Sequence, residues 1–194
     1  MPEALSFPQE LKRKSIHIAT AVIPISYFLW FSREQIFWLS VFLTIGFFTA
    51  DILRMKFALA EKYFIRIFSP LLRSGELQRR FTGASYLFLG ITITVAAFPK
   101  KVAVPAVFIA ALADSLAALG GKLYGRHSLL DKTWEGTLTF AAVAAGLTGW
   151  FWGFGLKMFV VAIPTAAVEL AGEKLNDNLT VPILSALLIQ AVYL

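Results

Sequence analysis

Long apolar blocks alternate with short polar segments along the whole of this 194-residue sequence. A helix needs about 20 apolar residues to cross a bilayer core of about 30 Å. Measured against that length, the pattern predicts six or seven membrane-spanning helices, and seven fits the blocks better. We therefore expect an all-α fold, a polytopic membrane helical bundle. The predicted spans are residues 15–32, 35–53, 83–99, 102–121, 137–155, 157–174 and 179–194.

The segment 54–80, between the second and third predicted spans, follows a different pattern. Its apolar residues recur at helical spacing, while basic residues occupy another face. This pattern is typical of an amphipathic helix that lies in the membrane interface. A cytoplasmic extension of the second span, packed on the bundle, explains it equally well. The apolar positions are Phe57, Ala60, Phe64, Ile67 and Leu71, and the basic ones are Lys62, Arg66 and Arg73.

Composition supports a membrane protein and excludes several other classes. Hydrophobic residues make up 58% of the chain and charged residues 15%, whereas soluble domains are about half apolar and about a quarter charged. The absence of cysteine excludes a disulfide scaffold. No repeats or linkers divide the chain, so we expect residues 1–194 to form one integral membrane domain. The net charge of +6 fits loops at an anionic membrane surface, with no nucleic-acid partner.

Basic residues are distributed unevenly between the predicted loops. Lys and Arg concentrate on the cytoplasmic side of membrane proteins. A cytoplasmic N-terminus puts 14 of the 18 Lys and Arg residues inside and leaves Arg33, Lys100, Lys101 and Lys157 outside. This asymmetry predicts a multi-pass protein of the cell or inner membrane. Its N-terminus and its polar motifs would face the cytoplasm, and with seven spans its C-terminus would lie outside.

Two acidic residues stand inside predicted apolar spans. An ionisable group at mid-helix costs about 2.5–3.5 kcal/mol on insertion, so Asp114 and Glu169 are candidate functional residues. Glu169, Glu173 and Asp177 follow at i, i+4 and i+8, which puts three carboxylates on one helix face. We predict that Asp114, Glu169 and Asp177 meet at the inner ends of their helices. There they would bind Mg²⁺, which prefers oxygen ligands.

Structural ion pairs are the alternative interpretation of the acidic residues. The basic residues available on the same side are Lys122, Arg126, Lys132 and Lys174. We prefer this alternative for Glu173, Asp131 and Asp51. Asp51 has Arg54 one helical turn away, at a spacing that favours pairing.

A glycine-rich, basic segment follows Asp114. Glycine lets a backbone approach phosphate closely, and Lys or Arg then neutralises the phosphate charge. The combination predicts a phosphate-binding segment, although a glycine-rich helix face is also typical of close packing between membrane helices. The glycines are Gly120, Gly121 and Gly125, and the basic residues are Lys122, Arg126 and Lys132.

A second basic group lies at the start of the first predicted span. Arg13 and His17 lie at positions i and i+4, with Lys14 between them. Basic residues ahead of a first span are ordinarily topology signals. His17 lies at the start of the apolar run, however, and is a candidate to hydrogen-bond a phosphate or to carry a proton.

Five short motifs occur in order between about residue 10 and residue 185. They are Arg13-Lys14-x-x-His17; Arg73-x-x-Glu76 leading to Thr82-Gly83-Ala84-Ser85-Tyr86; Asp114-x-x-Ala117-x-x-Gly120 with Gly125; Lys132-Thr-Trp-Glu135-Gly136-Thr137; and Glu169 followed by Asp177-Asn178 and Pro182. Together they resemble the CTP-dependent lipid-alcohol kinases, among them dolichol, phytol and farnesol kinases and the CTP-dependent diacylglycerol kinase of yeast type.

The resemblance implies a multi-helix membrane enzyme that uses Mg²⁺ and moves the γ-phosphate of CTP to the hydroxyl of a lipid alcohol, releasing CDP. Its partners would be the lipid alcohol, CTP and membrane lipids, and a homodimer is compatible with it. It implies catalytic roles for Asp114, Lys132 and His17, with Asp114, Glu169 and Asp177 as metal ligands. The nucleotide would contact Arg13, Lys14, Gly120, Gly121, Lys122, Gly125, Arg126, Lys132, Glu135, Gly136 and Asn178.

Two other functions compete with the kinase. The segment Lys132–Gly136 is also similar to phosphatidate cytidylyltransferase, which releases pyrophosphate, but the usual C-terminal signature of that enzyme is absent here. A transporter could line an ion path with Asp114 and Glu169. Charges are absent from the outer halves of the spans, however, and there is no inverted repeat. The kinase is therefore preferred, while the identity of the alcohol is left open.

Overall fold

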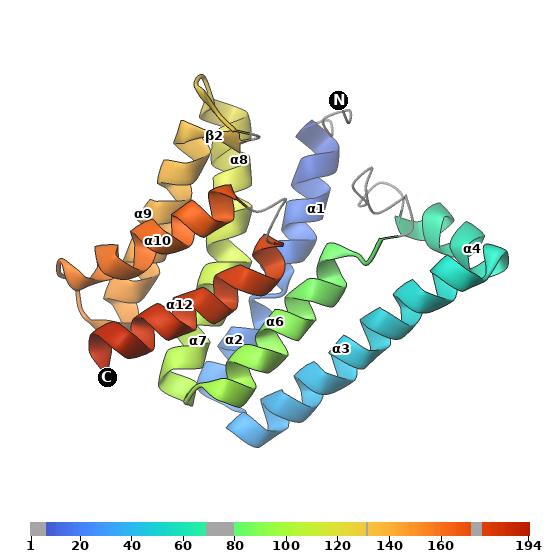
Figure 1. Ribbon diagram of the computed structural model, residues 1–194, viewed down its shortest axis with the longest axis horizontal. Coiled ribbons are helices and arrows are strands. Elements are labelled where there is room, and N and C mark those ends of the chain that lie inside the picture. The colour runs from blue at the N-terminus through green and yellow to red at the C-terminus, as the bar shows by residue number, and fades with distance from the viewer. Residues whose placement is uncertain (1–6, 69–79, 131, 172–175) are drawn as a thin grey trace.

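The computed structural model describes residues 7–68, 80–130, 132–171 and 176–194, which form helices apart from one short hairpin (Figure 1). The prediction of an all-α fold is confirmed. In chain order the elements are α1 (Phe7–Ala19), α2 (Val22–Leu29), α3 (Arg33–Lys56), α4 (Ala58–Phe68), α6 (Gly83–Ala97), α7 (Lys100–Phe108), the π-helical turn η2 (Ile109–Ala113), α8 (Asp114–Tyr124), β1 (Ser128–Leu129), β2 (Lys132–Thr133), α9 (Trp134–Trp152), α10 (Lys157–Leu170) and α12 (Asp177–Tyr193).

One continuous helix forms the centre of the bundle. It consists of α7, η2 and α8, and 72% of its most apolar stretch is buried. The helices α1 and α9 contact its α8 part, while α2 and α12 contact its α7 part. Small buried residues along it, such as Ala103, Ala106, Ala113 and Ala117, allow these neighbours to approach closely. The central helix therefore connects the helices that pack around it (Figure 1).

The long helix α3 lies at the edge of the bundle, beside α6 (Figure 1). Only 17% of its most apolar stretch is buried. Trp38, Phe42 and Ile45, which lie on one face of the helix, are 61%, 73% and 61% exposed. A row of large exposed apolar side chains of this kind marks a surface that contacts a nonpolar partner.

Among the residues described, two helices are long and apolar enough to cross a membrane: α3 and the continuous helix Lys100–Tyr124. Shorter apolar helices, α6 and α12, lie where two further spans were expected. Helices α9 and α10 also coincide with expected spans, but by length or hydropathy they do not qualify as full spans. The prediction of seven full-length spans is therefore not confirmed.

The first predicted span, 15–32, is wrong as a single helix. Helix α1 ends at Ala19 and α2 begins at Val22, with a turn between them. Pro24 has no N–H to donate to the carbonyl four residues earlier, on Thr20. That carbonyl accepts instead from the N–H of Ile23 at 3.0 Å. The change in bonding interrupts the helix one turn before the proline.

The predicted amphipathic segment 54–80 contains the separate helix α4, and residues 69–79 lie outside the described residues. Helix α3 ends at Lys56, and Phe57 adopts an extended backbone, so α4 is not a continuation of α3. No residue of α4 is buried. Its contact with the preceding helix includes the guanidinium of Arg54, which lies 4.8 Å from the centre of the Phe64 ring.

A buried carboxylate joins α3 to the start of α6. Asp51 is 1% exposed, and its Oδ1 atom accepts a hydrogen bond from Nε of Arg54 at 2.7 Å. Its Oδ2 atom accepts from the N–H of Thr82 at 2.8 Å and from the hydroxyl of Ser85 at 2.6 Å. A negative charge at the N-terminus of a helix is also favourable. The prediction that Asp51 and Arg54 form a structural ion pair is confirmed.

Candidate active site

Three helices bring carboxylates together at one end of the bundle. Asp114 is the first residue of α8, Glu169 lies in the last turn of α10, and Asp177 begins α12. One oxygen from each lies within 4.8 Å of the others, and all three residues are buried. The residues that we expected to meet are therefore close neighbours in the fold. Their binding of Mg²⁺ stays a prediction.

Two lysines from distant parts of the chain compensate these charges. The ammonium group of Lys14, a residue only 2% exposed, lies 2.6 Å from Oδ2 of Asp114. The ammonium group of Lys132 lies 2.5 Å from Oε1 of Glu169 and 3.4 Å from Oδ2 of Asp177. Buried charges need such partners because their desolvation is costly. Among the residues that the structure describes, two lysines facing three carboxylates leave one negative charge in excess.

One atom of the cluster is left without a partner. Oε2 of Glu169 is buried and accepts no hydrogen bond from any residue that the structure describes. An ionised carboxylate oxygen in that position is costly unless a cation or a donor reaches it. The cluster thus combines excess negative charge with an unused oxygen ligand.

The π-helical turn η2 directly precedes Asp114 and contacts α1. Turns of this kind are rare, and they shift the backbone hydrogen bonds of a helix. The Nε2 atom of His17 lies 3.2 Å from the carbonyl oxygen of Ala110 and 3.6 Å from Oδ2 of Asp114. Both neighbours are acceptors, so Nε2 carries the ring proton. His17 therefore donates to the turn and lies beside the carboxylate.

The β1–β2 hairpin determines where Lys132 reaches. Ser128 pairs with Thr133 and Leu129 with Lys132 across the two strands, and Leu130 adopts a φ of 54° at the turn. Consecutive side chains of a strand point to opposite sides. Lys132 extends to the carboxylates, while the Thr133 hydroxyl accepts from the N–H of Gly136 at 3.1 Å and caps α9.

The glycines expected near phosphate lie in the contact between α8 and α9. A Cβ atom on Gly120 would lie 2.7 Å from the Thr139 hydroxyl, and one on Gly121 would lie 2.7 Å from the Thr133 hydroxyl. On Gly136 it would lie 3.0 Å from the carbonyl of Ala117. The close-packing alternative therefore accounts for these positions. Their contact with phosphate stays a prediction, and the N–H of Gly136 is already used in the cap.

Three of the expected nucleotide contacts line one cavity of about 580 Å³ beside the hairpin: Gly125, Arg126 and Glu135. His127 also lines this cavity, and its Nδ1 atom lies 2.9 Å from Oε1 of Glu135. This hydrogen bond is the main cause that lowers the pKa of the Glu135 carboxyl to about 2. Glu135 is thus ionised, and a positive and a negative side chain share the cavity.

The remaining candidates are less closely tied to the cluster. Arg13 is half-buried on α1, and Lys122 is exposed on α8. Asn178 follows Asp177, and its N–H donates to Oδ1 of that residue at 3.0 Å. Several residues of the sequence analysis lie outside the described residues, namely Leu71, Arg73, Glu76, Asp131, Glu173 and Lys174.

Gly90 on α6 is a site-positioning residue that the sequence analysis missed. A Cβ atom there would lie 2.8 Å from the carbonyl oxygen of Asn178 and 2.9 Å from the ring of Pro182. The absence of a side chain lets the first turn of α12, which carries Asp177, pack directly on α6. The sequence feature that could have identified this position is a glycine in the middle of an apolar helix, which is typical of close helix packing.

Comparisons with known proteins point to the class of enzyme that the five sequence motifs resemble. The phytol kinase of Synechocystis is 32% identical, over 93% of this chain and 78% of that protein. The CTP-dependent diacylglycerol kinase 1 of Schizosaccharomyces pombe is 23% identical over 75% of each chain. The chain belongs to the CTP-dependent lipid kinase family. This lipid kinase is also 30% identical to the uncharacterized protein RP860 of Rickettsia prowazekii, over 91% of each chain. No family model and no solved structure matches it.

The resemblance stated from the five motifs is thereby confirmed. The motifs of this lipid kinase family also fall on the elements of the cluster: α1 carries Lys14 and His17, α8 carries Asp114, and β2 carries Lys132. The segment with Glu169 and Asp177 supplies the other two carboxylates. Residues far apart in the sequence are therefore neighbours at one end of the fold.

The packing at Gly90 generates a test of how the kinase positions its site. We expect Gly90→Ala to displace the first turn of α12, to lower stability by about 1–3 kcal/mol through overpacking, and to reduce lipid phosphorylation. Thermal unfolding of the purified protein and a phosphorylation assay measure the two effects.

Gly46→Ala is the matched control. Gly46 lies in helix α3, where an added Cβ atom would meet nothing within 4 Å, and alanine favours a helix by about 1 kcal/mol over glycine. We expect this variant to be neutral or stabilising. If Gly90→Ala behaves like Gly46→Ala, the close approach of α12 does not position Asp177.

Proposed function

We propose that this protein is an integral membrane kinase that transfers the γ-phosphate of CTP to the hydroxyl of a lipid alcohol and releases CDP. The alcohol is an isoprenoid of the polyprenol or phytol type, or a diacylglycerol. The observation that carries the proposal is the cluster of Asp114, Glu169 and Asp177, held against two lysines at one end of the bundle. The names of the relatives, a phytol kinase and diacylglycerol kinases, support a lipid as the acceptor.

The carboxylate cluster fits a magnesium ion. It offers hard oxygen ligands, an excess negative charge and one buried oxygen without a partner, Oε2 of Glu169, among the residues that the structure describes. Mg²⁺ typically binds one or two carboxylates and shares its remaining positions with substrate phosphates and water. Asp114, Glu169 and Asp177 would hold the ion, which would neutralise charge on the phosphates of CTP.

The basic residues around the cluster would bind the triphosphate. Phosphoryl transfer depends mainly on positioning and on stabilising the charge of the phosphoryl oxygens. An ammonium group has three donors, and Lys14 uses two of them on Asp114, so the third can contact a phosphate oxygen. Lys132 already donates to three acceptors on Glu169 and Asp177, so it would exchange its 3.4 Å contact with Asp177 for a phosphate oxygen. Arg126, in the cavity beside the hairpin, would contact the outer part of the nucleotide.

The transfer itself forms one bond and breaks one. The oxygen of the alcohol attacks the γ-phosphorus, and the bond from that phosphorus to the bridging oxygen breaks, with its electron pair leaving on CDP. The hydroxyl proton must pass to a base. Nε2 of His17 already carries a proton toward the Ala110 carbonyl, so we assign the base to the carboxylate of Asp114. Lys14, which donates to Oδ2 at 2.6 Å, would orient that carboxylate.

The exposed apolar surface supports a location in the membrane. The row formed by Trp38, Phe42 and Ile45 would face lipid, as would much of the remaining surface of α3. In this proposal the chain crosses the bilayer several times, and α4 lies along the cytoplasmic interface. The asymmetry of Lys and Arg then puts the carboxylate cluster at the cytoplasmic end, where CTP is available.

The products distinguish this kinase from a cytidylyltransferase. With CTP, Mg²⁺ and an isoprenoid alcohol or a diacylglycerol, we expect the purified protein to form CDP and a lipid monophosphate in equal amounts. Nucleotide chromatography and lipid mass spectrometry measure both. With phosphatidate as the acceptor, we expect no reaction; release of pyrophosphate and a CDP-linked lipid would establish the cytidylyltransferase instead.

The role of the carboxylate cluster has a direct test. Asp114→Asn removes a charge at nearly constant volume, so we expect turnover to fall by at least about a hundredfold while the protein stays folded. Initial rates and thermal unfolding measure the two properties. Glu34→Gln, an exposed acidic residue at the far end of α3, is the control and should keep normal turnover. Unchanged turnover in Asp114→Asn would remove this residue from the mechanism.

The orientation can be tested with single cysteines, because the chain contains none. Ser128 on β1 and Gly155 between α9 and α10 are both exposed. In sealed, inside-out vesicles we expect Ser128→Cys to react with an impermeant maleimide and Gly155→Cys to be protected. In right-side-out vesicles the pattern should reverse. Labelling of both cysteines from one side would contradict the proposed topology.

A further inference from the structure

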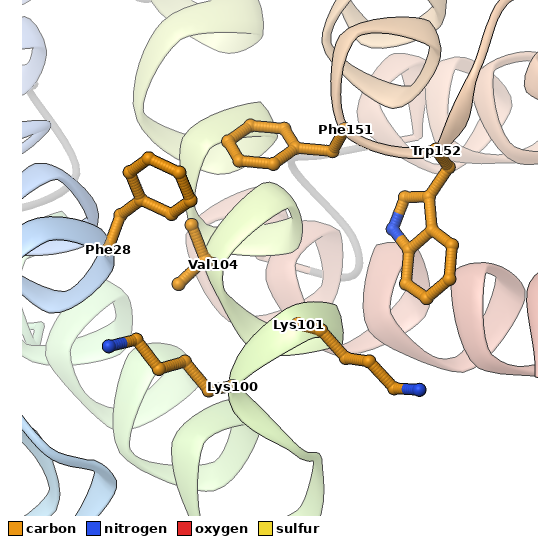
Figure 2. A pocket seen from close by; sticks show the side chains of 6 residues that line it. All are labelled: Phe28, Lys100, Lys101, Val104, Phe151 and Trp152. Atoms are coloured by element: carbon orange, nitrogen blue, oxygen red, sulfur yellow. The ribbon is translucent and has the colours of Figure 1, made fainter.

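A second cavity, of about 490 Å³, lies at the end of the bundle opposite the carboxylates. Helices α2, α7 and α9 contribute its walls, and Figure 2 shows the six side chains that line it. At a rise of about 1.5 Å per residue, the central helix separates Lys101 from Asp114 by about 20 Å. The cavity is therefore distinct from the proposed site of phosphate transfer. Its lining is Phe28, Lys100, Lys101, Val104, Phe151 and Trp152.

The deeper part of this cavity is apolar. Val104 is 1% exposed, and the rings of Phe28 and Phe151 meet edge to face with their centres 5.6 Å apart. Phe28 is itself 54% exposed, so the apolar part opens to the surroundings. The lining continues to the indole of Trp152, whose N–H is buried and finds no acceptor among the described residues. A nonpolar chain could occupy this space.

Two lysines flank the apolar part. Lys100 and Lys101 are consecutive at the start of α7, and Figure 2 shows their side chains extending in opposite directions. The ammonium of Lys100 donates to the carbonyl of Phe31 at 3.1 Å and lies 5.3 Å from the centre of the Tyr27 ring. That of Lys101 lies 5.8 Å from the centre of the Trp152 ring.

Neither lysine has an acidic partner within ion-pair distance in the part of the chain that the structure describes. Both also lie in the first turn of α7, where the helix dipole adds positive potential. The edge of an apolar cavity thus carries two uncompensated positive charges. Their environment suits a molecule that is nonpolar at one end and anionic at the other.

We propose that this cavity binds an anionic phospholipid, with an acyl chain against Phe28, Val104 and Phe151 and the headgroup phosphate at Lys101, while Lys100 adds positive potential from the opposite side of the cavity. The inference rests on the membrane location in the proposed function. A neutral lipid would leave both lysines without an anion, and inorganic phosphate would leave the apolar space unfilled. The lipid would belong to the leaflet opposite the kinase site, so it would not be the substrate.

The test uses the full chain in nanodiscs of phosphatidylcholine and phosphatidylglycerol. Native mass spectrometry after release into detergent measures which lipid stays bound. We expect the wild type to retain phosphatidylglycerol preferentially. Because each lysine near an anionic headgroup is worth about a fivefold change in affinity, the double variant K100Q/K101Q should lower this retention by about 25-fold.

Lys157→Gln is the matched control. Lys157 lies at the same end of the bundle and 5.7 Å from the centre of the Tyr193 ring, but it does not line the cavity. We expect it to keep the preference for phosphatidylglycerol. Equal losses in K157Q and K100Q/K101Q would mean that only the overall surface charge matters, which would overturn a specific site.

A second variant leaves both lysines in place. Phe28→Glu puts a carboxylate at the exposed wall of the cavity, so it should repel the anionic headgroup and abolish the preference. Thermal unfolding checks that each variant is folded. No lipid preference in the wild type would overturn this proposal, whereas CDP release in phosphatidylcholine nanodiscs tests the kinase separately.

Discussion

Three carboxylates buried at one end of a helical bundle require compensating charge, and much of the fold serves that requirement. Lys14 reaches Asp114 across 100 residues of sequence, and Lys132 reaches Glu169 across 37. The N-terminal helix and the hairpin are therefore both held at this end of the bundle by ion pairs. Within the described part of the chain these pairs leave an excess negative charge and an unused oxygen, which is why we propose that the cluster that organises the bundle also binds a cation.

Small residues determine where the carboxylates and their lysine partners lie. Gly121 and Gly136 bring α8 and α9 close together, which puts the hairpin, and with it Lys132, over the carboxylates. Gly90 does the same for the first turn of α12 and Asp177. The glycines near the cluster thus act first through helix packing. Direct contact with a ligand would be an additional role for the same positions.

The sequence was sufficient to identify the all-α class, the family and the acidic members of the cluster, because Asp114 and Glu169 stand out in apolar surroundings. It was less informative where tertiary contacts decide. Lys14 resembles an ordinary basic residue ahead of a first span, and its burial depends on a partner 100 residues away. The steric role of Gly90 depends on α12, and the break before Pro24 divides an apolar block that hydropathy alone treats as continuous.

The π-helical turn η2 also has a consequence for how the two ends of the molecule are related. Successive residues of an α-helix are about 100° apart around its axis. A π turn contains an extra residue, so it changes the angular relation between the segments on either side. Loss of a single residue within Ile109–Ala113 would therefore rotate Lys100 and Lys101 relative to Asp114, even though all three charged side chains would still be present. In this protein the number of residues in one turn sets the relative orientation of the two ends of the central helix, independently of which residues they are.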